Sequence, residues 1–178
     1  MKSYDYKSRK GTREISWDHF AEMCRILAER ISSYDPELVI GIARAGLYPA
    51  TLISGMLRKE FYPVRITRRE NDQVKYNRPV WITDLPESIT HKRILVVDEI
   101  ADTGETMSIV INKASQMNSL EVRSAVLISH SWADPKPDYF VLESDKMILF
   151  PWDSQILIDG QWQLHPEIIE ALNFQKRS

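Results

Sequence analysis

"RILVVDEIADTGETMSIVI", residues 93–111, joins four consecutive apolar residues to two carboxylates and a short polar turn. A run of four apolar residues is typical of a parallel strand that is covered on both faces. The acids Asp98 and Glu99 follow it directly, and after the turn the chain continues as a predicted helix. Packing does not explain two acids at the end of a buried strand. The stretch therefore indicates chemistry at this point of the chain.

The flanking sequence predicts strands that alternate with helices. An amphipathic helix, with Ser16 or Asp18 as its cap, ends before Pro36, and a strand over Leu38–Ile42 leads through a turn into a helix with Pro49 in its first turn. Further strands are predicted near residue 62, at 121–129 and, as one or two short strands, within 138–153. This alternation favours an α/β fold, a central parallel sheet flanked by helices, with ligands beyond the carboxyl ends of the strands.

Length and composition exclude several classes of protein. The 178 residues suit a single domain, 1–178, and 27% charged with 43% hydrophobic residues is an ordinary globular profile. A net charge of -2 offers no basic excess for a nucleic-acid backbone. The lone Cys24 excludes a disulfide framework, and no apolar run is long enough for a membrane span or a signal peptide. We therefore expect a cytoplasmic protein that binds neither nucleic acid nor membrane.

The turn after the acids suits a phosphate monoester. Asp102, Thr103, Gly104, Glu105 and Thr106 run straight into the predicted helix, so backbone N–H groups, small hydroxyls and the positive end of a helix dipole meet there. Gly104 allows a close backbone approach or a positive φ. Carboxylates repel phosphate, so the preceding acid pair instead suits sugar hydroxyls or a hydrated Mg²⁺. A ligand with a phosphate, a diol and a magnesium-bound anion, such as phosphoribosyl pyrophosphate, would satisfy all these groups.

"VVDEIADTGET" resembles the phosphoribosyl-pyrophosphate motif of the type I phosphoribosyltransferases: apolar residues, two acids, two variable residues and Asp-Thr-Gly-x-Thr. The resemblance, which covers roughly residues 15–153, implies that family's fold, with a small C-terminal hood for the base, and a Mg²⁺ cofactor. It also implies binding of the sugar donor by Asp98, Glu99 and Asp102–Thr106. Asp98 and Glu99 would face the metal through water or together with ribose hydroxyls. A P-loop is excluded, because no Gly-Lys-Ser/Thr follows a strand.

Two further segments match the family in place. "GIARAGLYPA" resembles its pyrophosphate loop, which puts Arg44, Ala45 and Gly46 in a turn where the family often has a non-proline cis peptide, and an Ala can take part in such a bond. The polar excursion at about residues 66–80 matches the family's flexible catalytic loop. Such a lid would place cations over the departing pyrophosphate and exclude water. Among the lid residues Arg68, Arg69 and Lys75, we favour Arg69 or Arg68.

The base-binding hood, about residues 129–153, resembles the xanthine-guanine and archaeal hypoxanthine branch and includes its Pro-Trp-Asp, here residues 151–153. Two departures concern the base. Met147, with Ile148 beside it, replaces a stacking Trp, and His130 stands nearest to a Lys that donates to the purine 6-oxo group. A neutral His can accept from an exocyclic amine, which favours adenine. The alternatives are that Lys136 restores the cation and a 6-oxopurine preference, that His130 only caps a strand end, and that Met147 and Ile148 are core residues.

The resemblance implies a purine phosphoribosyltransferase that forms a nucleoside monophosphate and pyrophosphate, with Asp102 as the proton relay at the base and Arg69 as a lid cation. The other class left open is a regulator that binds the sugar donor without turnover, although this chain is short for an added DNA-binding domain and balanced in charge. The family also suggests a homodimer. We predict a helical tail over about residues 154–178, with a helix from Pro166, and assign it no chemistry.

Overall fold

The chain forms two compact units in the computed structural model, which describes residues 9, 11–70 and 73–175. The larger unit comprises residues 23–144, and the smaller unit combines residues up to 22 with those from 145 onward. Helix α1, Trp17–Ile31, contributes to both units. The prediction of a single domain concerns how the chain folds and functions as a whole, and it stays a prediction.

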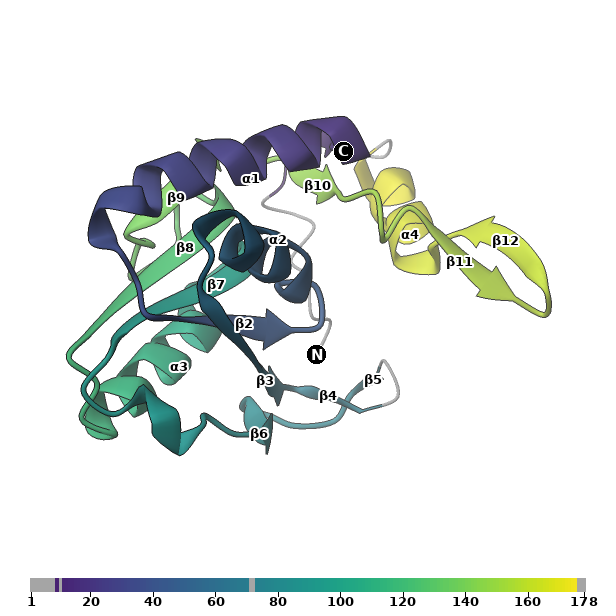
Figure 1. Ribbon diagram of the computed structural model, residues 1–178. Coiled ribbons are helices and arrows are strands. Elements are labelled where there is room, and N and C mark those ends of the chain that lie inside the picture. Colours follow the sequence, from purple (N-terminus) through teal and green to yellow (C-terminus); the bar gives the residue numbers. More distant parts are fainter. Residues whose placement is uncertain (1–8, 10, 71–72, 176–178) are drawn as a thin grey trace. The chain divides into compact units, whose positions relative to one another are not determined.

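The larger unit is built on a six-stranded sheet with the order β6-β3-β2-β7-β8-β9 (Figure 1). All neighbouring strands run parallel except β6, which pairs antiparallel with β3 at one edge. The strands are β2 Leu38–Ala43, β3 Glu60–Thr67, β6 Val80–Thr83, β7 Arg93–Ala101, β8 Glu121–Ser129 and β9 Tyr139–Glu143. The predicted α/β fold with a central, mostly parallel sheet is confirmed.

The order of the strands locates the place where a ligand would bind. In chain order, the five parallel strands lie as second, first, third, fourth and fifth across the sheet. In such a doubly wound sheet the strand order reverses between the first and third strands, and ligands bind beyond the carboxyl ends at that point. Here these strands are β2 and β7, the two strands that lead into the unusual turns of the sequence.

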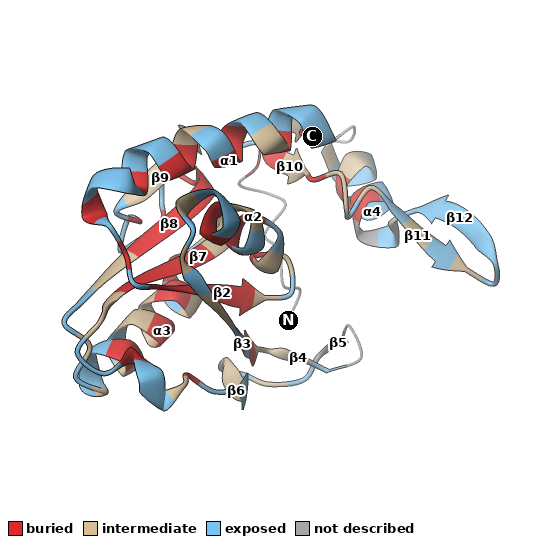
Figure 2. Ribbon diagram, viewed as in Figure 1, coloured by how far each residue is buried: buried red, intermediate tan, exposed pale blue. Residues whose placement is uncertain are grey.

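Helices cover both faces of the sheet (Figure 1). On one face, Val96 and Val126 belong to a cluster with Met107 and Val110 of α3. On the other, α2 packs so closely that a Cβ on Gly41 would lie 2.8 Å from Ala50 Cβ. The central strands β2, β7 and β8 are largely buried between these layers (Figure 2), whereas β3, β6 and β9 are mostly half-buried or exposed. The remaining helices of this unit are α2 Leu47–Leu57, α3 Glu105–Gln116 and two short 3-10 helices, Ser32–Tyr34 and Glu87–Ile89.

The helix boundaries follow the signals in the sequence. His19 N donates to Ser16 Oγ at 3.1 Å, so Ser16 rather than Asp18 caps α1. Pro49 lies in the first turn of α2, where the missing N–H costs no intrahelical bond. None of the helices in the described part of the chain has both the length and the apolar character needed to cross a membrane.

The smaller unit corrects the prediction of a helical tail over 154–178. Strands β1 Thr12–Glu14 and β10 Met147–Leu149 pair in parallel, β11 Gln155–Ile158 and β12 Gln161–Leu164 form a hairpin, and the helix α4 spans Pro166–Gln175. The hairpin turns at Asp159 and Gly160, whose φ angles are 48° and 75°. Asp-Gly supplies the left-handed pair that a two-residue hairpin loop requires. The predicted helix start at Pro166 is confirmed.

The polar excursion of the larger unit contains a short hairpin rather than a wholly irregular loop. Strand β4, Arg69–Glu70, pairs antiparallel with β5, Gln73–Val74, and residues 71 and 72 between them lie outside the described residues. Backbone N–H groups of Lys75 and Tyr76 both donate to the carbonyl of Arg68, at 2.9 and 3.0 Å. The beginning and end of the excursion are therefore joined by hydrogen bonds.

Candidate active site

Two turns meet at the carboxyl edge of the sheet because β2 and β7 are neighbours. The register pairs Leu38 with Ile94 and Gly41 with Val97, so the residues after position 43 lie near the acids at positions 98 and 99. The acids stand within the last residues of β7, which continues to Ala101. The structure thus brings together the turn Arg44–Gly46 and the acid pair, as the sequence predicted from two separate segments.

Gly46 is the point of closest approach between these segments. A Cβ built on Gly46 would lie 2.5 Å from Asp98 Oδ1, 2.9 Å from Asp98 Cα and 2.6 Å from the carbonyl oxygen of Ile42. A larger residue cannot fit without displacing backbone. Arg44 is exposed and Ala45 is half-buried, and the non-proline cis peptide bond joins Ala43 to Arg44 rather than involving Ala45.

The acid pair carries an electrostatic cost. Asp98 is half-buried, and its Oδ1 accepts a hydrogen bond from the backbone N–H of Glu99 at 3.0 Å. Burial, followed by the charge of Glu99, raises the pKa of Asp98 well above its ordinary value. A cation or a set of hydroxyl donors would lower this cost, because either favours the charged form of the carboxylate. The pair is therefore suited to hold a cationic or hydroxyl-rich group.

The loop between β7 and α3 has the backbone of an anion site. Gly104 precedes α3 with a φ of 84°, and a Cβ there would lie 2.8 Å from the carbonyl oxygen of Asp134. The first bond of the helix runs from Ser108 N to Gly104 O at 3.0 Å. The N–H groups of the first turn stand outside the helical ladder, and that of Glu105 donates to Thr103 Oγ1 at 3.3 Å. Thr103 and Glu105 are exposed, and Asp102 and Thr106 are half-buried.

Backbone hydrogen bonds join the turn after β8 to the loop between β7 and α3. His130 N donates to Ala101 O and Asp134 N donates to Thr103 O, each at 3.1 Å. The indole Nε1–H of Trp132 donates to Asp102 Oδ1 at 3.2 Å. Sequence reasoning did not single out Trp132. Its signal was a large aromatic residue in the polar segment "SHSWADPKPD" directly after a sheet strand, at the edge where ligands bind.

His130 is completely buried in the larger unit. Its Nδ1 lies 2.5 Å from the carbonyl oxygen of Ser144, and its ring stacks on that of Trp132, with centroids 4.5 Å apart and planes at 17°. A carbonyl oxygen only accepts, so Nδ1 carries the proton and Nε2 of the neutral ring is an acceptor. Lys136, the alternative cation, forms an ion pair with Glu143.

Met147 and Ile148 belong to the smaller unit. Met147 is 4% exposed and packs with Ile168 and Ala171 of α4, while Ile148 is half-buried. Met147 thus packs as a core residue, which is one of the two alternatives for this position. A contact of Met147 with a base stays a prediction. Trp152 of the Pro-Trp-Asp segment stacks on Phe150 with centroids 4.6 Å apart and meets Phe20 edge-on at 5.2 Å.

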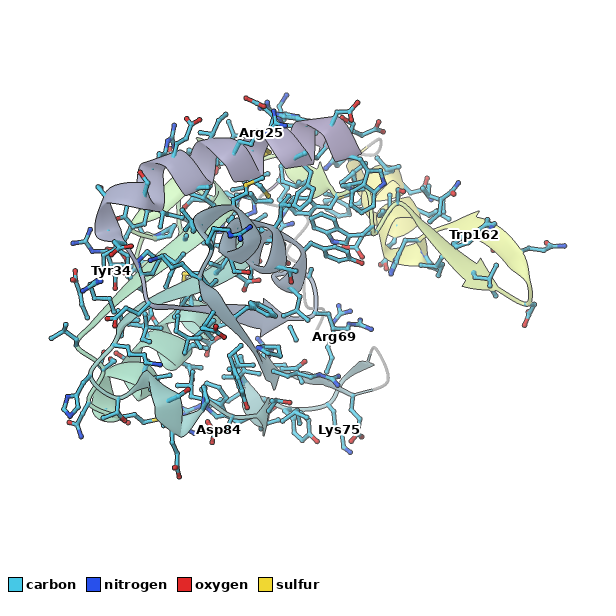
Figure 3. The ribbon with its side chains drawn as sticks, in the orientation of Figure 1. Arg25, Tyr34, Arg69, Lys75, Asp84 and Trp162 are labelled. Carbon is cyan, nitrogen blue, oxygen red and sulfur yellow. The ribbon has the colours of Figure 1, made fainter. Side chains whose placement is uncertain are left out.

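The lid cations come from the excursion between β3 and β6. Arg68 and Arg69 are half-buried, whereas Lys75 is exposed and pairs with Glu70 across the hairpin. Figure 3 labels the side chains of Arg69 and Lys75 on this excursion. The hydrogen bond that Lys75 Nζ donates to the Glu70 carboxylate raises the pKa of Lys75. Lys75 would have to leave Glu70 to reach a ligand. After β6, Asp84 accepts from Lys113 Nζ of α3 at 2.5 Å, which ties the end of the excursion to the sheet unit.

The acid pair also fits the way proteins hold magnesium. Among the residues that the structure describes, no group of three or more His, Cys, Asp or Glu side chains is arranged as a metal site. Mg²⁺ is usually bound through one or two carboxylates together with water and substrate phosphates. Asp98 and Glu99 provide such a donor pair, and the raised pKa of Asp98 indicates that a cation would be favourable there.

Comparison with known proteins identifies the family. Residues 16–158 match the model of the phosphoribosyl transferase domain. The hypoxanthine-guanine phosphoribosyltransferase of Saccharomyces cerevisiae is 23% identical, over 85% of this chain and 90% of its own length. The crystal structure of a purine phosphoribosyltransferase from Pyrococcus horikoshii has a TM-score of 0.73 and 28% identity, over 83% of this chain and 98% of that one. A xanthine-guanine-hypoxanthine phosphoribosyltransferase from Helicobacter pylori has a TM-score of 0.67 and 20% identity, over 81% and 93%. The chain thus belongs to the phosphoribosyltransferase family and is a transferase.

Proposed function

We propose that this protein transfers the phosphoribosyl group of phosphoribosyl pyrophosphate to a free purine, forming a nucleoside 5′-monophosphate and pyrophosphate. A ring nitrogen of the base displaces pyrophosphate from C1 of the ribose through an oxocarbenium-like state. The observation that carries the proposal is the contact of Gly46 with Asp98. In this proposal Gly46 belongs to the turn that binds pyrophosphate and Asp98 to the acid pair that binds the diol, and the two lie so close that a side-chain carbon on Gly46 would not fit between them. The names of the relatives support a purine acceptor.

The 5′-phosphate is the anchor in this proposal. The backbone N–H groups of residues 102–106 and the start of α3 hold it, with the hydroxyls of Thr103 and Thr106 as further donors. Anchoring the donor at one end makes the attack of the base effectively unimolecular. The acids of β7 accept from the ribose hydroxyls and stand near the positive charge that grows on the sugar ring.

The leaving group lies, in this proposal, at the turn Arg44–Gly46. Its N–H groups face the pyrophosphate, and Mg²⁺, held by Asp98 and Glu99 through water or together with ribose hydroxyls, would neutralise part of the charge on the leaving group. Arg69 or Arg68 adds a cation from the lid.

Asp102 is the proposed proton relay. It stands at the start of the phosphate loop, where its carboxylate can accept or return a proton at the ring nitrogen opposite the attacking one. For the acceptor base, the tautomer of His130 favours adenine, because Nε2 can accept from an exocyclic amine but cannot donate to a 6-oxo group. Contact with a base requires movement of the groups that bury His130, of which the stacked Trp132 is one.

A 6-oxopurine acceptor is the second candidate. The yeast relative is named for hypoxanthine and guanine, and the Helicobacter pylori protein for xanthine, guanine and hypoxanthine. If His130 were doubly protonated, both ring nitrogens would donate, and a 6-oxo group would suit it. A protein that binds the sugar donor without turnover is the candidate from another class, and a homodimer in the cytoplasm is the expected form of the enzyme.

The test is the release of pyrophosphate from phosphoribosyl pyrophosphate and Mg²⁺, with adenine, hypoxanthine, guanine, xanthine and uracil offered separately. Turnover with adenine alone supports the role of the His130 tautomer, and preference for hypoxanthine or guanine supports the second candidate. Asp102→Asn should reduce turnover strongly. Asp159→Asn, the same change in the exposed β11–β12 turn, serves as its matched control. Binding of the donor with no turnover of any base would refute the enzymatic proposal and favour the non-catalytic binder.

A further inference from the structure

Trp132 makes two side-chain contacts that point in different directions. Its Nε1–H donates to Asp102 Oδ1 at 3.2 Å, and its ring lies on the His130 imidazole, with centroids 4.5 Å apart. Its side chain is 36% exposed, so one part is buried against these two residues and another part faces solvent. Trp132 thus links the loop after β7 with the end of β8.

The backbone around Trp132 holds the indole in place. His130 N donates to Ala101 O, Ala133 N donates to His130 O, and Asp134 N donates to Thr103 O, at distances of 3.1–3.2 Å. Asp134 also lies against Gly104, whose absent side chain permits the approach. With bonds on both sides of Trp132, its Cα cannot shift without breaking contacts to the phosphate loop. A side chain on such a support keeps a fixed direction.

We infer that Trp132 is a positioning residue that sets the orientation of the Asp102 carboxylate. The inference rests on the proposed function, in which Asp102 exchanges a proton with the base. The side chain of an aspartate has two rotatable bonds, and a hydrogen bond to one oxygen restricts the orientations that its carboxylate can adopt. Proton transfer depends steeply on such alignment. Binding of the sugar donor, which uses the backbone of the same loop, does not depend on it.

Trp132→Phe separates the two contacts. Phenylalanine keeps an aromatic ring for stacking on His130 but removes the N–H donor together with part of the bulk of the indole. A hydrogen bond to a charged group contributes enough that its loss should lower kcat about tenfold. KM for phosphoribosyl pyrophosphate should change less than about twofold, because the anchoring amides remain. The matched control is Trp162→Phe, the same substitution at an exposed position of β12.

Two further variants make the result decisive. Replacing Trp132 by 3-benzothienylalanine keeps the bicyclic shape and substitutes sulfur for the N–H, so it avoids any packing defect of phenylalanine. In an Asp102→Asn background, Trp132→Phe should cause little additional loss, since the residue that it positions is already altered. Thermal unfolding and donor binding, measured on each variant, identify any that does not fold.

The outcomes distinguish the inference from the proposed function. If the wild-type protein turns over no purine, the proposed function fails and the inference fails with it. If the wild type is active and the benzothienyl variant keeps its kcat, only the inference is overturned. An equal loss from Trp132→Phe in the presence and absence of Asp102 also overturns it, because the effect would then act through His130. If Trp132→Phe changes only KM for the sugar donor and leaves kcat unchanged, the inference is also overturned.

Discussion

Gly46→Ala tests whether the pyrophosphate turn and the acid pair must touch. Gly46 has φ −62° and ψ −15°, an ordinary helical conformation that alanine adopts readily. Because alanine lowers the conformational entropy of the unfolded chain, this effect alone would predict a more stable protein, by roughly 0.4–1 kcal/mol. The new methyl group, however, would lie 2.6 Å from the Ile42 carbonyl oxygen and 2.9 Å from Asp98 Cα. Both are backbone atoms that cannot rotate away, so steric repulsion and the entropy effect predict changes in stability of opposite sign.

The expected magnitude follows from the two opposing effects. Adding a methylene-sized group to a close-packed site costs about 1–3 kcal/mol, and the lower entropy of the unfolded chain offsets up to about 1 kcal/mol of it. The net destabilisation should be about 1–2 kcal/mol. Gly55→Ala in the same helix is the matched control, because a Cβ at Gly55 would meet nothing within 4 Å. It should stabilise the protein by about 0.5–1 kcal/mol.

Urea denaturation measures the free energy of unfolding of both variants, and steady-state pyrophosphate release measures catalysis. Displacement of the turn by several tenths of an ångström to 1 Å should lower kcat/KM for phosphoribosyl pyrophosphate by about 100-fold in Gly46→Ala. Gly55→Ala should keep wild-type kinetics. If Gly46→Ala were as stable and as active as Gly55→Ala, the contact between the two segments would not matter, and the reasoning would be refuted.

Three further predictions concern other residues of the larger unit. Asp98→Asn should stabilise the protein near neutral pH by on the order of 1 kcal/mol while impairing use of the sugar donor. The raised pKa of Asp98 means that the folded state binds this proton more tightly than the unfolded state, so wild-type stability falls as pH rises from the ordinary aspartate range through the raised pKa. Denaturation across that pH range should show this decline in the wild type and a smaller one in the variant; an equal decline in both would contradict the assignment. Gly104→Ala should destabilise by about 2–3 kcal/mol, because it combines a φ of 84° with a contact at 2.8 Å to a backbone oxygen, and unfolding as stable as wild type would count against it. Cys24 is buried, and burial raises the pKa of its thiol to about 12, so a thiol reagent should modify it only in denaturant; rapid labelling of the native protein would show that the helix opens.

Local patterns predicted most of the sheet unit. Apolar runs marked the strands, three- and four-residue spacings marked α1, and the order of strands and helices indicated a parallel sheet. The motif after β7 predicts a phosphate site because loop, glycine and helix start are contiguous in sequence, and this role stays a prediction. The general rule for such sheets predicts that both turns lie at the carboxyl edge, but it does not predict which residues touch. The close approach of Gly46 to Asp98 follows only from the pairing of β2 with β7 in the structure.

Side-chain partners across loops could not be predicted in the same way. Nothing local to His130 indicates that Ser144 holds its Nδ1 or that Trp132 covers its ring, because these contacts depend on how β8 and β9 end. The hairpin of residues 155–164 is a different case. Asp159-Gly160 is a strong hairpin signal, and the expectation of a helical tail over 154–178 gives it too little weight beside the helical pattern after Pro166.

The acid pair connects the stability of this protein to its proposed function. Without ligand, the folded state holds two adjacent carboxylates in a half-buried position, and the raised pKa of Asp98 records the cost. A ligand that supplies a cation and hydroxyl donors removes part of that cost, and binding to the folded state alone increases its stability. Phosphoribosyl pyrophosphate with Mg²⁺ should therefore raise the thermal midpoint of the wild type more than that of Asp98→Asn, from which most of the cost is already absent. In the proposed function, the same two carboxylates that destabilise the free protein would favour a sugar donor with magnesium over a phosphate alone.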